Sequence, residues 1–452
     1  MLSITISDTP PTNTAMISFS LPIIGITLTP SSGSAVSVFS SNPSTDFELT
    51  RLQTDTNLIV ANQKVTAGTY KAVNVTVAGA TGVFDNTSST GFGTCAAGAV
   101  CGISGSAATI TYTFPTSSPL VLTGNTNQWL NLDFNYNNAI VSTSSSVGID
   151  VTQTGVLTAT STVPAGVSSG NFANIDDFTG SITALSSGSI TVQSSLRGSL
   201  TAAITSSIPV YDPQNNQCPG GGSLSCISKG SIVSVQAVLS NTGVLNATSL
   251  DVIDASPAPA DEVEGMIYGL CPNQSGYGII LSDSTIFTAS SPLTSAPFGQ
   301  VVCLTPSQSA TFAIDTGILT GQAGVPVGGA GFTSASDIYA GQTIRAKVTG
   351  ATSGTGTISA TASEFLLRFS RITVTVNTAT TLTFSVSALP PFITEFTTMP
   401  QVQTYQNATL LEGITSINSL QTGQDVSISA LLLSPATAGT QFLFQAAKVR
   451  LP

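Results

Sequence analysis

The sequence lacks histidine altogether, and charged side chains are scarce, with 11 basic and 22 acidic residues among 452. Without an imidazole, the chain cannot form a Ser-His-Asp or Cys-His triad or a histidine-ligated metal site. The net charge of −11 repels phosphate groups, and no local cluster of Lys or Arg offsets it, so we expect no nucleic-acid partner. We also expect no transmembrane segment, because no stretch reaches the roughly 18 consecutive apolar residues that a spanning helix needs.

Charged residues make up 7% of the chain, well below the roughly 25% that is usual, whereas hydrophobic residues make up an ordinary 41%. Serine, threonine, asparagine and glycine must therefore cover most of the surface. A chain of this length has room for about three domains, each with a core of its own. Apolar and polar residues alternate with a period of two and many are β-branched, so we predict an all-β fold.

The six cysteines fall along the chain as three neighbouring pairs: Cys95 with Cys101, Cys218 with Cys226, and Cys271 with Cys303. We predict three local disulfides, which would place the protein in an oxidising compartment, outside the cell or on its surface. The alternative, six free thiols in a cytosolic protein, is disfavoured because Cys218 lies close to Gly-Gly-Gly, where a thiol would be exposed and reactive. Zinc binding requires closer cysteine spacing or histidine ligands, and the sequence has neither.

Residues 2–6 form an alternating segment directly after Met1. No basic segment, apolar stretch or cleavage site typical of a secretion signal precedes them. We therefore expect that a leader has been removed or that export uses an unusual signal.

Residues 1–157 are expected to form one antiparallel β-sandwich. Strands are predicted at residues 73–77, 109–114 and 130–134, each with apolar residues at alternate positions. Earlier in the chain the apolar positions change from odd to even between Ile23 and Ile24, one residue after Pro22. This change of phase predicts a β-bulge on a bent or edge strand. A polar linker, residues 158–175, is expected to follow the sandwich.

The rest of the chain carries a repeat anchored on Gly230, Gly341 and Gly423. Each glycine follows an apolar residue and two spacers, and each precedes an alternating strand. A hairpin comes before each anchor, and a strand with an apolar-x-Ala step comes after it. Four parts in a row would make an elongated molecule. We predict three small OB-like β-barrel modules, at residues 176–256, at residues 262–369 with a long insertion, and at residues 370–452.

Four N-terminal motifs stand out: TISDTPP at residues 5–11, VTAGTY at residues 65–70, the loop from Gly93 to Cys101, and LDFN at residues 132–135. They resemble the N-terminal domain of unknown function found in bacterial exported lipoproteins. The glycine-anchored units resemble the small barrel domains, also of unknown function, that follow it in such proteins. The resemblance implies an envelope or extracellular location and a lipid-anchored N-terminus, although the sequence has no lipobox cysteine. The resemblance does not assign a catalytic role to any residue of this sequence.

Paired carboxylates are the remaining candidates for chemistry: Asp176 with Asp177, Asp251 with Asp254, and the run Asp261, Glu262 and Glu264. Neighbouring strand residues point to opposite faces, and so do residues at i and i+3, so we expect neither aspartate pair to converge. The third group lies beside two prolines and is expected to be a solvated linker, with a surface Ca²⁺ site as the alternative. Asp133, between two apolar strand residues, is expected to point outward.

We expect a non-enzymatic extracellular or cell-surface structural protein, a subunit of a homo-oligomer or self-assembling fibre, with no cofactor and no metal. Its β-rich surface lacks the charges that usually keep edge strands from pairing with other chains. The alternative is a glycan-binding or adhesive module. An enzyme would require two carboxylates brought together across strands in a cleft. A glycan-binding module would stack sugars on exposed aromatic rings, for which the candidates are Trp129, Tyr136, Tyr268, Tyr277 and Tyr339.

Overall fold

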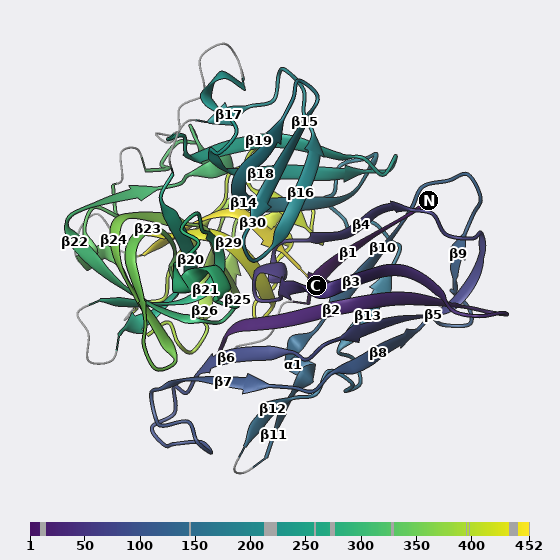
Figure 1. The fold of residues 1–452 in the computed structure, drawn as a ribbon, viewed down its shortest axis with the longest axis horizontal. Coiled ribbons are helices and arrows are strands. Elements are labelled where there is room, and N and C mark those ends of the chain that lie inside the picture. The colour runs from purple at the N-terminus through teal and green to yellow at the C-terminus, as the bar shows by residue number, and fades with distance from the viewer. Residues whose placement is uncertain are drawn as a thin grey trace.

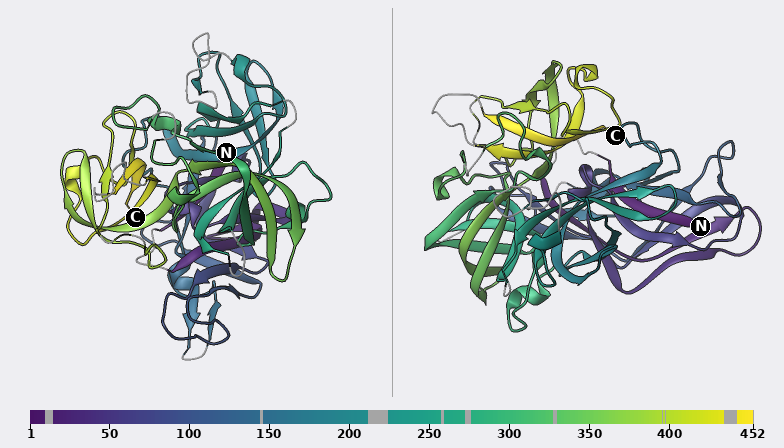
Figure 2. Two further views of the ribbon diagram at one scale, coloured as in Figure 1. Left: turned by 90° about the vertical axis from the view of Figure 1, so that its left-hand side faces the viewer. Right: turned by 90° about the horizontal axis from the view of Figure 1, so that it is seen from above.

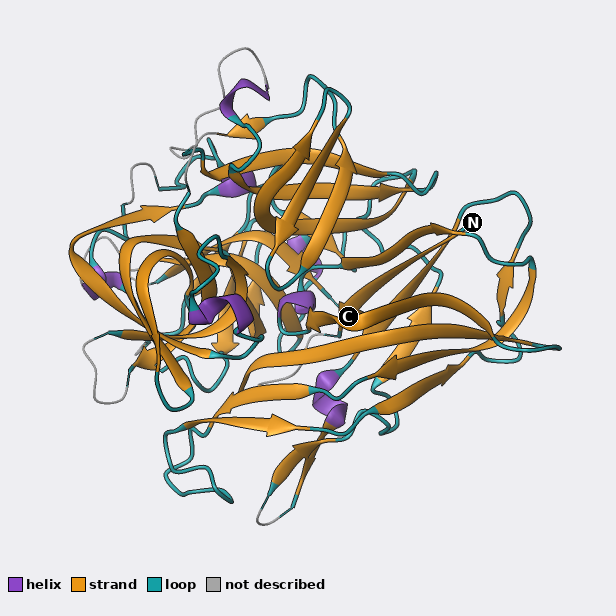
Figure 3. Ribbon diagram, in the orientation of Figure 1, coloured by secondary structure: helices purple, strands orange, loops and turns teal. Residues whose placement is uncertain are grey.

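The structure is a computed structural model that describes residues 1–9, 15–143, 146–211, 224–256, 259–271, 276–326, 330–394, 396, 398–433 and 442–451. Nearly all of its regular structure is β-strand (Figure 3), as the alternation in the sequence predicts. The helical segments in the described part of the chain are single turns: η1 (Arg51–Gln53), α1 (Tyr136–Ala139), η2 (Leu224–Cys226), η3 (Pro292–Ser295), η4 (Gly317–Leu319), η5 (Ala335–Asp337) and η6 (Ile417–Ser419). Among the described residues no helix is long and apolar enough to cross a membrane.

The N-terminal part contains a four-stranded sheet of order β13-β10-β1-β4 and a seven-stranded sheet of order β7-β6-β2-β5-β8, with β3 beside β2 and β9 beside β5. A small hairpin, β11–β12, lies outside both. One pairing departs from the expected antiparallel arrangement, because β1 and β10 run parallel, with Ile4 opposite Leu130. The strands are β1 (Leu2–Asp8), β2 (Met16–Pro30), β3 (Val36–Glu48), β4 (Asn57–Gln63), β5 (Gly68–Val77), β6 (Thr81–Asp85), β7 (Val100–Ser104), β8 (Ala108–Thr113), β9 (Leu120–Leu122), β10 (Gln128–Phe134), β11 (Ile140–Ser142), β12 (Val147–Ile149) and β13 (Leu157–Thr160).

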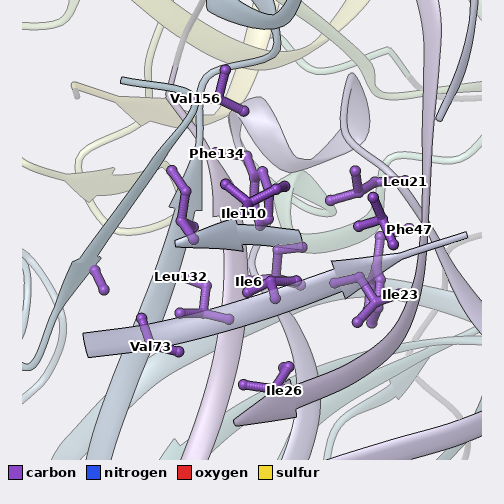
Figure 4. Packing of buried hydrophobic residues seen from close by; sticks show 14 of the residues in the cluster. Ile6, Leu21, Ile23, Ile26, Phe47, Val73, Ile110, Leu132, Phe134 and Val156 are labelled. Atoms are coloured by element: carbon purple, nitrogen blue, oxygen red, sulfur yellow. The ribbon is translucent and has the colours of Figure 1, made fainter. Parts of the chain in front are cut away.

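The core of this N-terminal domain forms between the two sheets. Ile6 and Leu132 from the four-stranded sheet pack with Val73 and Ile110 from the seven-stranded sheet (Figure 4), and all four are buried. The predicted bulge is present in β2, where the register with both neighbouring strands shifts between Ile23 and residue 25. It lies inside a bent strand that is paired on both sides rather than on an edge strand.

The remaining strands form three modules with one shared pairing order. We count the five strands that the modules share and leave out the short β17 and β28: a hairpin opens each module, the fourth and fifth strands pair antiparallel, and the third strand runs parallel to the fifth. The middle module is a closed five-stranded barrel. Module 1 contains β14 (Asn171–Leu185), β15 (Ser189–Ser194), β16 (Gly198–Ala203), β17 (Val210–Tyr211), β18 (Ile232–Ser240) and β19 (Leu245–Asp254). Module 2 contains β20 (Asp261–Leu270), β21 (Tyr277–Thr285), β22 (Val301–Ile314), β23 (Thr343–Ser353) and β24 (Thr357–Arg368). Module 3 contains β25 (Ser370–Ala379), β26 (Thr383–Ala388), β27 (Gln401–Gln403), β28 (Leu410–Glu412), β29 (Asp425–Leu433) and β30 (Leu443–Arg450).

The three anchor glycines occupy equivalent places. Gly230, Gly341 and Gly423 have φ angles of +97°, +94° and +82°, a region that glycine enters without the penalty of a Cβ. Each donates its backbone N–H to the first strand of its module: the acceptors are the carbonyls of Ile182, Ile267 and Val376, at 2.9, 2.9 and 2.8 Å. The glycine therefore turns the chain so that the fourth strand starts directly beside the first.

Two of the predicted disulfides lie in the described part of the chain. Cys95 is bonded to Cys101, and Cys271 is bonded to Cys303. Cys218, the expected partner of Cys226, lies outside the described residues.

The four parts do not follow one another in a row. The N-terminal domain, in purple and blue, and the three modules, in teal, green and yellow, surround a common junction (Figures 1 and 2). Strand β14 begins at Asn171, inside the segment expected to be a linker, so the connection between the N-terminal domain and module 1 is shorter than expected. The molecule is therefore more compact than a chain of beads, which the spacing of repeats alone could not indicate.

Candidate functional site: a buried ionic junction

Twelve of the 33 charged side chains of this protein, 6 of the 11 basic and 6 of the 22 acidic, gather where the four parts meet. We call this cluster the junction, and its members are each no more than 9% exposed. The N-terminal domain contributes Arg51 and Asp55, and module 1 contributes Asp176 and Asp177. Module 2 contributes Glu262, Glu264, Arg345 and Arg368, and module 3 contributes Arg371, Lys448 and Arg450, with Glu412 from β28.

Asp177 lies at the centre of the junction. Its carboxylate pairs with Arg368 and Arg371, and the Nη2 atom of Arg51 lies 3.3 Å from its Oδ2. The hydroxyl of Ser234 also donates to Oδ1, at 2.6 Å. Burial alone would raise the pKa of Asp177, but the three guanidinium groups outweigh it and hold the pKa well below its usual value. Asp177 of module 1 therefore remains negatively charged, and it forms ion pairs with the N-terminal domain, module 2 and module 3.

A bulge in β14 explains why Asp176 and Asp177 do not point to opposite faces of the strand, as expected from the sequence. The pairing of β14 with β18 shifts register between Ile175 and Phe178, and Asp177 has a φ of +52°. A bulge redirects side chains, so the rule that neighbouring strand residues face opposite sides fails here. Asp176 and Asp177 both reach buried cations of the junction, and the prediction that they would not converge on one site is wrong.

The run from Asp261 to Glu264 is divided between surface and interior. Asp261 accepts backbone hydrogen bonds from Phe287 and Thr288, at 2.7 and 2.9 Å. Glu262 and Glu264 are 1% and 0% exposed, so the predicted solvated linker is wrong for these two side chains. They lie two residues apart on β20 and therefore share the face that is turned toward the junction.

The two buried glutamates have basic partners from different parts of the chain. Glu262 pairs with Arg345, and Glu264 lies 2.5 Å from the Nη1 atom of Arg51. Burial would raise the pKa of Glu264, but Arg51 and Arg368 lower it to about 2. Oε2 of Glu262 and both carboxylate oxygens of Glu264 contact guanidinium groups, and both side chains are buried, which differs from the exposed carboxylates of the alternative surface Ca²⁺ site. No group of three or more His, Cys, Asp or Glu side chains suited to a metal ion occurs in the part of the chain that the structure describes.

Arg51 is placed by a turn that Glu48 holds. The buried Glu48 carboxylate accepts hydrogen bonds from the N–H of Phe19 at 2.9 Å, the hydroxyl of Thr50 at 2.6 Å and the hydroxyl of Ser18 at 2.7 Å. These contacts fix the entry to η1, whose first residue is Arg51. Burial of the carboxyl raises the pKa of Glu48 in spite of these hydrogen bonds.

Asp251 and Asp254 face different surroundings on β19. Asp254 lies 3.3 Å from Lys347, whose amino group also lies 2.9 Å from Glu364. Asp251 is buried, and its Oδ1 has no hydrogen-bond partner among the described residues. Burial, opposed by Arg368, raises the pKa of Asp251 to about 7. Asp251 is thus a buried carboxyl whose charge changes near neutral pH.

Lys448 forms a second centre within the junction. Its Nζ donates to Oδ2 of Asp176 at 2.7 Å and lies 2.9 Å from Oε2 of Glu412. Burial raises the pKa of Asp176, whereas Lys448 and Arg450 outweigh burial and lower the pKa of Glu412. The pKa of Lys448 is raised because its two carboxylate neighbours outweigh the effect of burial. The two carboxyls beside one amine therefore differ in their affinity for a proton.

The aromatic candidates for sugar platforms divide into two groups. Trp129 and Tyr136 are 3% and 1% exposed, so neither offers a ring to a ligand, and their expected role as platforms is wrong. Trp129 stacks on Phe172 and donates its indole N–H to Thr5 at 2.8 Å. The other three candidates, Tyr268, Tyr277 and Tyr339, are partly exposed. Asp133 is also partly exposed and accepts hydrogen bonds from Ser7 and Thr9.

The junction has almost no free space. A cavity of about 20 Å³ lies against Asp176, Asp177 and Lys448, and this volume holds about one water molecule. Two larger hollows, of about 390 and 340 Å³, are lined by a single acidic residue, Asp261, among the described residues. The charged side chains of the junction therefore border a cavity that is too small for a substrate.

The basic residues of the junction were not singled out from the sequence. A signal was available, because Arg345, Lys448 and Arg450 alternate with apolar residues on strands. Ile344 and Ala346 lie in the core of module 2, so Arg345 must point out of that barrel. In a chain with so few charges, a cation at such a position indicates a buried partner.

Comparison with known proteins gives a match for the N-terminal domain. No curated protein matches the chain. Residues 1–149 match DUF4382, a domain of unknown function, and this match includes most of the two N-terminal sheets.

Proposed function

We propose that this chain is a non-enzymatic structural protein of the cell exterior that assembles with copies of itself into a fibre. The observation that carries the proposal is the position of the charges. The junction holds most of the basic side chains in buried ion pairs, which leaves a surface rich in hydroxyl groups. Such a surface lacks the charges that usually prevent one sheet edge from pairing with another.

The seven-stranded sheet supplies two candidate edges for assembly. Within the described residues, β3 pairs only with β2, and β8 pairs only with β5. Strand β8 has no charged residue and no proline, the two devices that usually protect an edge. Because the two edges differ and lie on opposite sides of one sheet, pairing of β8 with β3 of a second copy would be head-to-tail. A contact of that kind extends without limit unless it closes into a ring.

The disulfides support a location outside the reducing cytosol. Cys95–Cys101 and Cys271–Cys303 stabilise a surface hairpin and the connection between β20 and β22. Disulfides persist mainly in secreted and cell-surface proteins.

The non-enzymatic assignment is supported by the surroundings of the acids. Catalytic carboxyl pairs need a cleft that admits the substrate. Here the paired carboxyls of the junction contact arginine or lysine, next to a cavity of about 20 Å³.

Concentration-dependent assembly tests the proposal. We expect sedimentation velocity of the purified protein to show growing species as concentration rises, and electron microscopy to show regular fibres. The variant Thr111→Lys, which places a charge on the exposed side of β8, should reduce assembly. The control variant Thr361→Lys places the same charge at an exposed position of β24, which is paired there with both β22 and β23, and should assemble normally. A protein that remains strictly monomeric at millimolar concentration would exclude the fibre.

A glycan-binding module is the second candidate, and one surface favours it. On the outer face of the seven-stranded sheet, the Asn74 amide donates to Thr27 and Thr29 at 3.2 and 3.0 Å, and Thr111 donates to the Asn74 oxygen at 2.9 Å. This row of amide and hydroxyl groups matches the polar groups that bind sugars. A glycan array without binding to the wild type, in the presence of fibres, would select self-assembly over adhesion.

A further inference from the structure

Lys448, Asp176 and Glu412 form a compact triad within the junction. Lys448 comes from β30, Asp176 from the bulge of β14, and Glu412 ends β28. The Nζ atom lies 2.7 Å from the Oδ2 atom of Asp176 and 2.9 Å from the Oε2 atom of Glu412. The carboxyl carbon of Asp176 is one C–O bond beyond Oδ2, so Nζ lies within about 4 Å of it. This separation is close to the distance from which two groups held in place react.

We propose that the side chains of Lys448 and Asp176 condense into an intramolecular isopeptide bond, with Glu412 transferring the proton. The inference does not depend on self-assembly or on glycan binding. It concerns a covalent link between module 1 and module 3.

The reaction is a condensation in which one water leaves. A proton first moves from the Lys448 ammonium to the Asp176 carboxylate, which gives a neutral amine beside a carboxylic acid. Nζ then attacks Cγ of Asp176 and forms the N–C bond. Glu412 accepts the second proton from Nζ and delivers it to the departing hydroxyl as the C–O bond breaks. The products are an amide, one water and the regenerated Glu412 carboxylate, and no oxidant or reductant takes part.

The surroundings assign different roles to the two acids. Burial raises the pKa of Asp176, which favours the protonated, electrophilic form. Lys448 and Arg450 lower the pKa of Glu412, which keeps this group ready to accept a proton. Two carboxyls whose pKa values are pushed apart form a pair of acid and base. Asp176 and Glu412 raise the pKa of Lys448 in spite of burial, so the transfer of its proton to Asp176 is the uphill step of the reaction.

A second triad in the same molecule provides an internal comparison. Lys347 lies 3.3 Å from Asp254 and 2.9 Å from Glu364, so it has the same kinds of partner. Its side chain is 24% exposed, whereas that of Lys448 is 3% exposed. Water stabilises the charged lysine at the exposed triad, so we expect condensation at Lys448 and none at Lys347.

Intact-mass spectrometry tests the bond. After reduction of the disulfides, the wild-type chain should be lighter than its sequence by the mass of one water. Digestion and tandem spectrometry should identify a branched peptide that joins Asp176 to Lys448. A wild-type chain with the full sequence mass, or a branch at other residues, overturns the proposal, and this measurement does not depend on the folding of any variant.

Three variants separate the roles. Lys448→Arg keeps the charge but removes the reactive amine, so the chain should have its full mass. Glu412→Gln keeps the shape but removes the base, so the bond should form far more slowly or not at all. Lys347→Arg is the matched control and should retain the loss of one water. If Glu412→Gln condenses at the wild-type rate, the role assigned to Glu412 is wrong.

Discussion

Arg51 and Glu264, 213 residues apart in the sequence, form an ion pair of 2.5 Å at which the N-terminal domain meets the barrel of module 2. Arg51 also contacts Asp177 of module 1, so one guanidinium connects three of the four parts. Both acids remain buried if the arginine is removed. A buried charge without its partner costs far more than the pair contributes when intact.

The variant Arg51→Met should therefore lower the free energy of unfolding by about 3 to 5 kcal/mol. Chemical denaturation followed by tyrosine and tryptophan fluorescence measures the loss. Lys64→Met is the matched control, because Lys64 is exposed and lies in the same domain. Its effect should stay within about 0.5 kcal/mol. Equal losses in the two variants would show that Arg51 does not act through its buried partners.

Glu264 and Asp251 give the stability opposite dependences on pH. The pKa of Glu264 is lowered from 4.5 to about 2, so its stabilising contribution is complete above pH 4.5 and is lost as the pH falls toward 2. The pKa of Asp251 is raised from 3.8 to about 7, so the folded protein binds the extra proton and loses stability as the pH rises from 3.8 to 7. We expect the greatest free energy of unfolding near about pH 4 to 5.

Denaturation at a series of pH values, at constant ionic strength, checks this profile. In the variant Asp251→Asn the free energy of unfolding should fall less between pH 4 and 7, because the amide has no proton to lose. The difference from the wild type should be at most about 4 kcal/mol. An unchanged slope in this variant would assign the decline to other buried acids, such as Asp8, whose pKa burial also raises.

The anchor glycines should be sensitive to a single methyl group. Gly341→Ala places a Cβ in a left-handed backbone conformation and 2.6 Å from the side chain of Ile393, so we expect a loss of about 2 kcal/mol or more. Gly423→Ala meets open space and should lose only the conformational cost of about 1 to 2 kcal/mol. Gly188→Ala is the control, since its backbone lies outside that region and a Cβ there meets nothing. Melting temperatures that fail to follow this order would contradict the role of the anchors.

The two disulfides should contribute unequally to the free energy of unfolding. The chain-entropy argument gives roughly 4 kcal/mol for the 32-residue separation of Cys271 and Cys303, and roughly 2 kcal/mol for the 6-residue separation of Cys95 and Cys101. Replacing each pair by serine and measuring denaturation midpoints tests the difference. Thiol titration of the unfolded, unreduced protein should find neither pair free.

Sequence patterns predicted those parts of the fold that local chemistry determines. The phase change at Ile23 and Ile24 located the bulge of β2, and three glycines located the start of the fourth strand in each module. Both features depend on the backbone preferences of a few neighbouring residues. Such preferences can be recognised without knowledge of the rest of the chain.

The junction could not be predicted in the same way. Asp176 and Asp177 depend on a bulge that no proline or glycine marks, and Glu262 and Glu264 depend on Arg51 and Arg345, which belong to distant segments. A charged strand residue faces either solvent or a partner from another domain, and one sequence does not distinguish them. The parallel pairing of β1 with β10 escaped prediction for the same reason, because it joins residues more than a hundred positions apart.

The contact between β30 and the N-terminal domain has a consequence for the folding route. Arg450 donates to the backbone oxygen of Leu52 at 3.0 Å, across 398 residues. Contacts this far apart in sequence slow folding, because the chain must lose much entropy before they form. On the ribosome, Asp176 of module 1 emerges long before Lys448 of β30 can pair with it. Strand β30 follows the N-terminal domain and modules 1 and 2 in the sequence, so its contacts join these parts only after all of them have been synthesised.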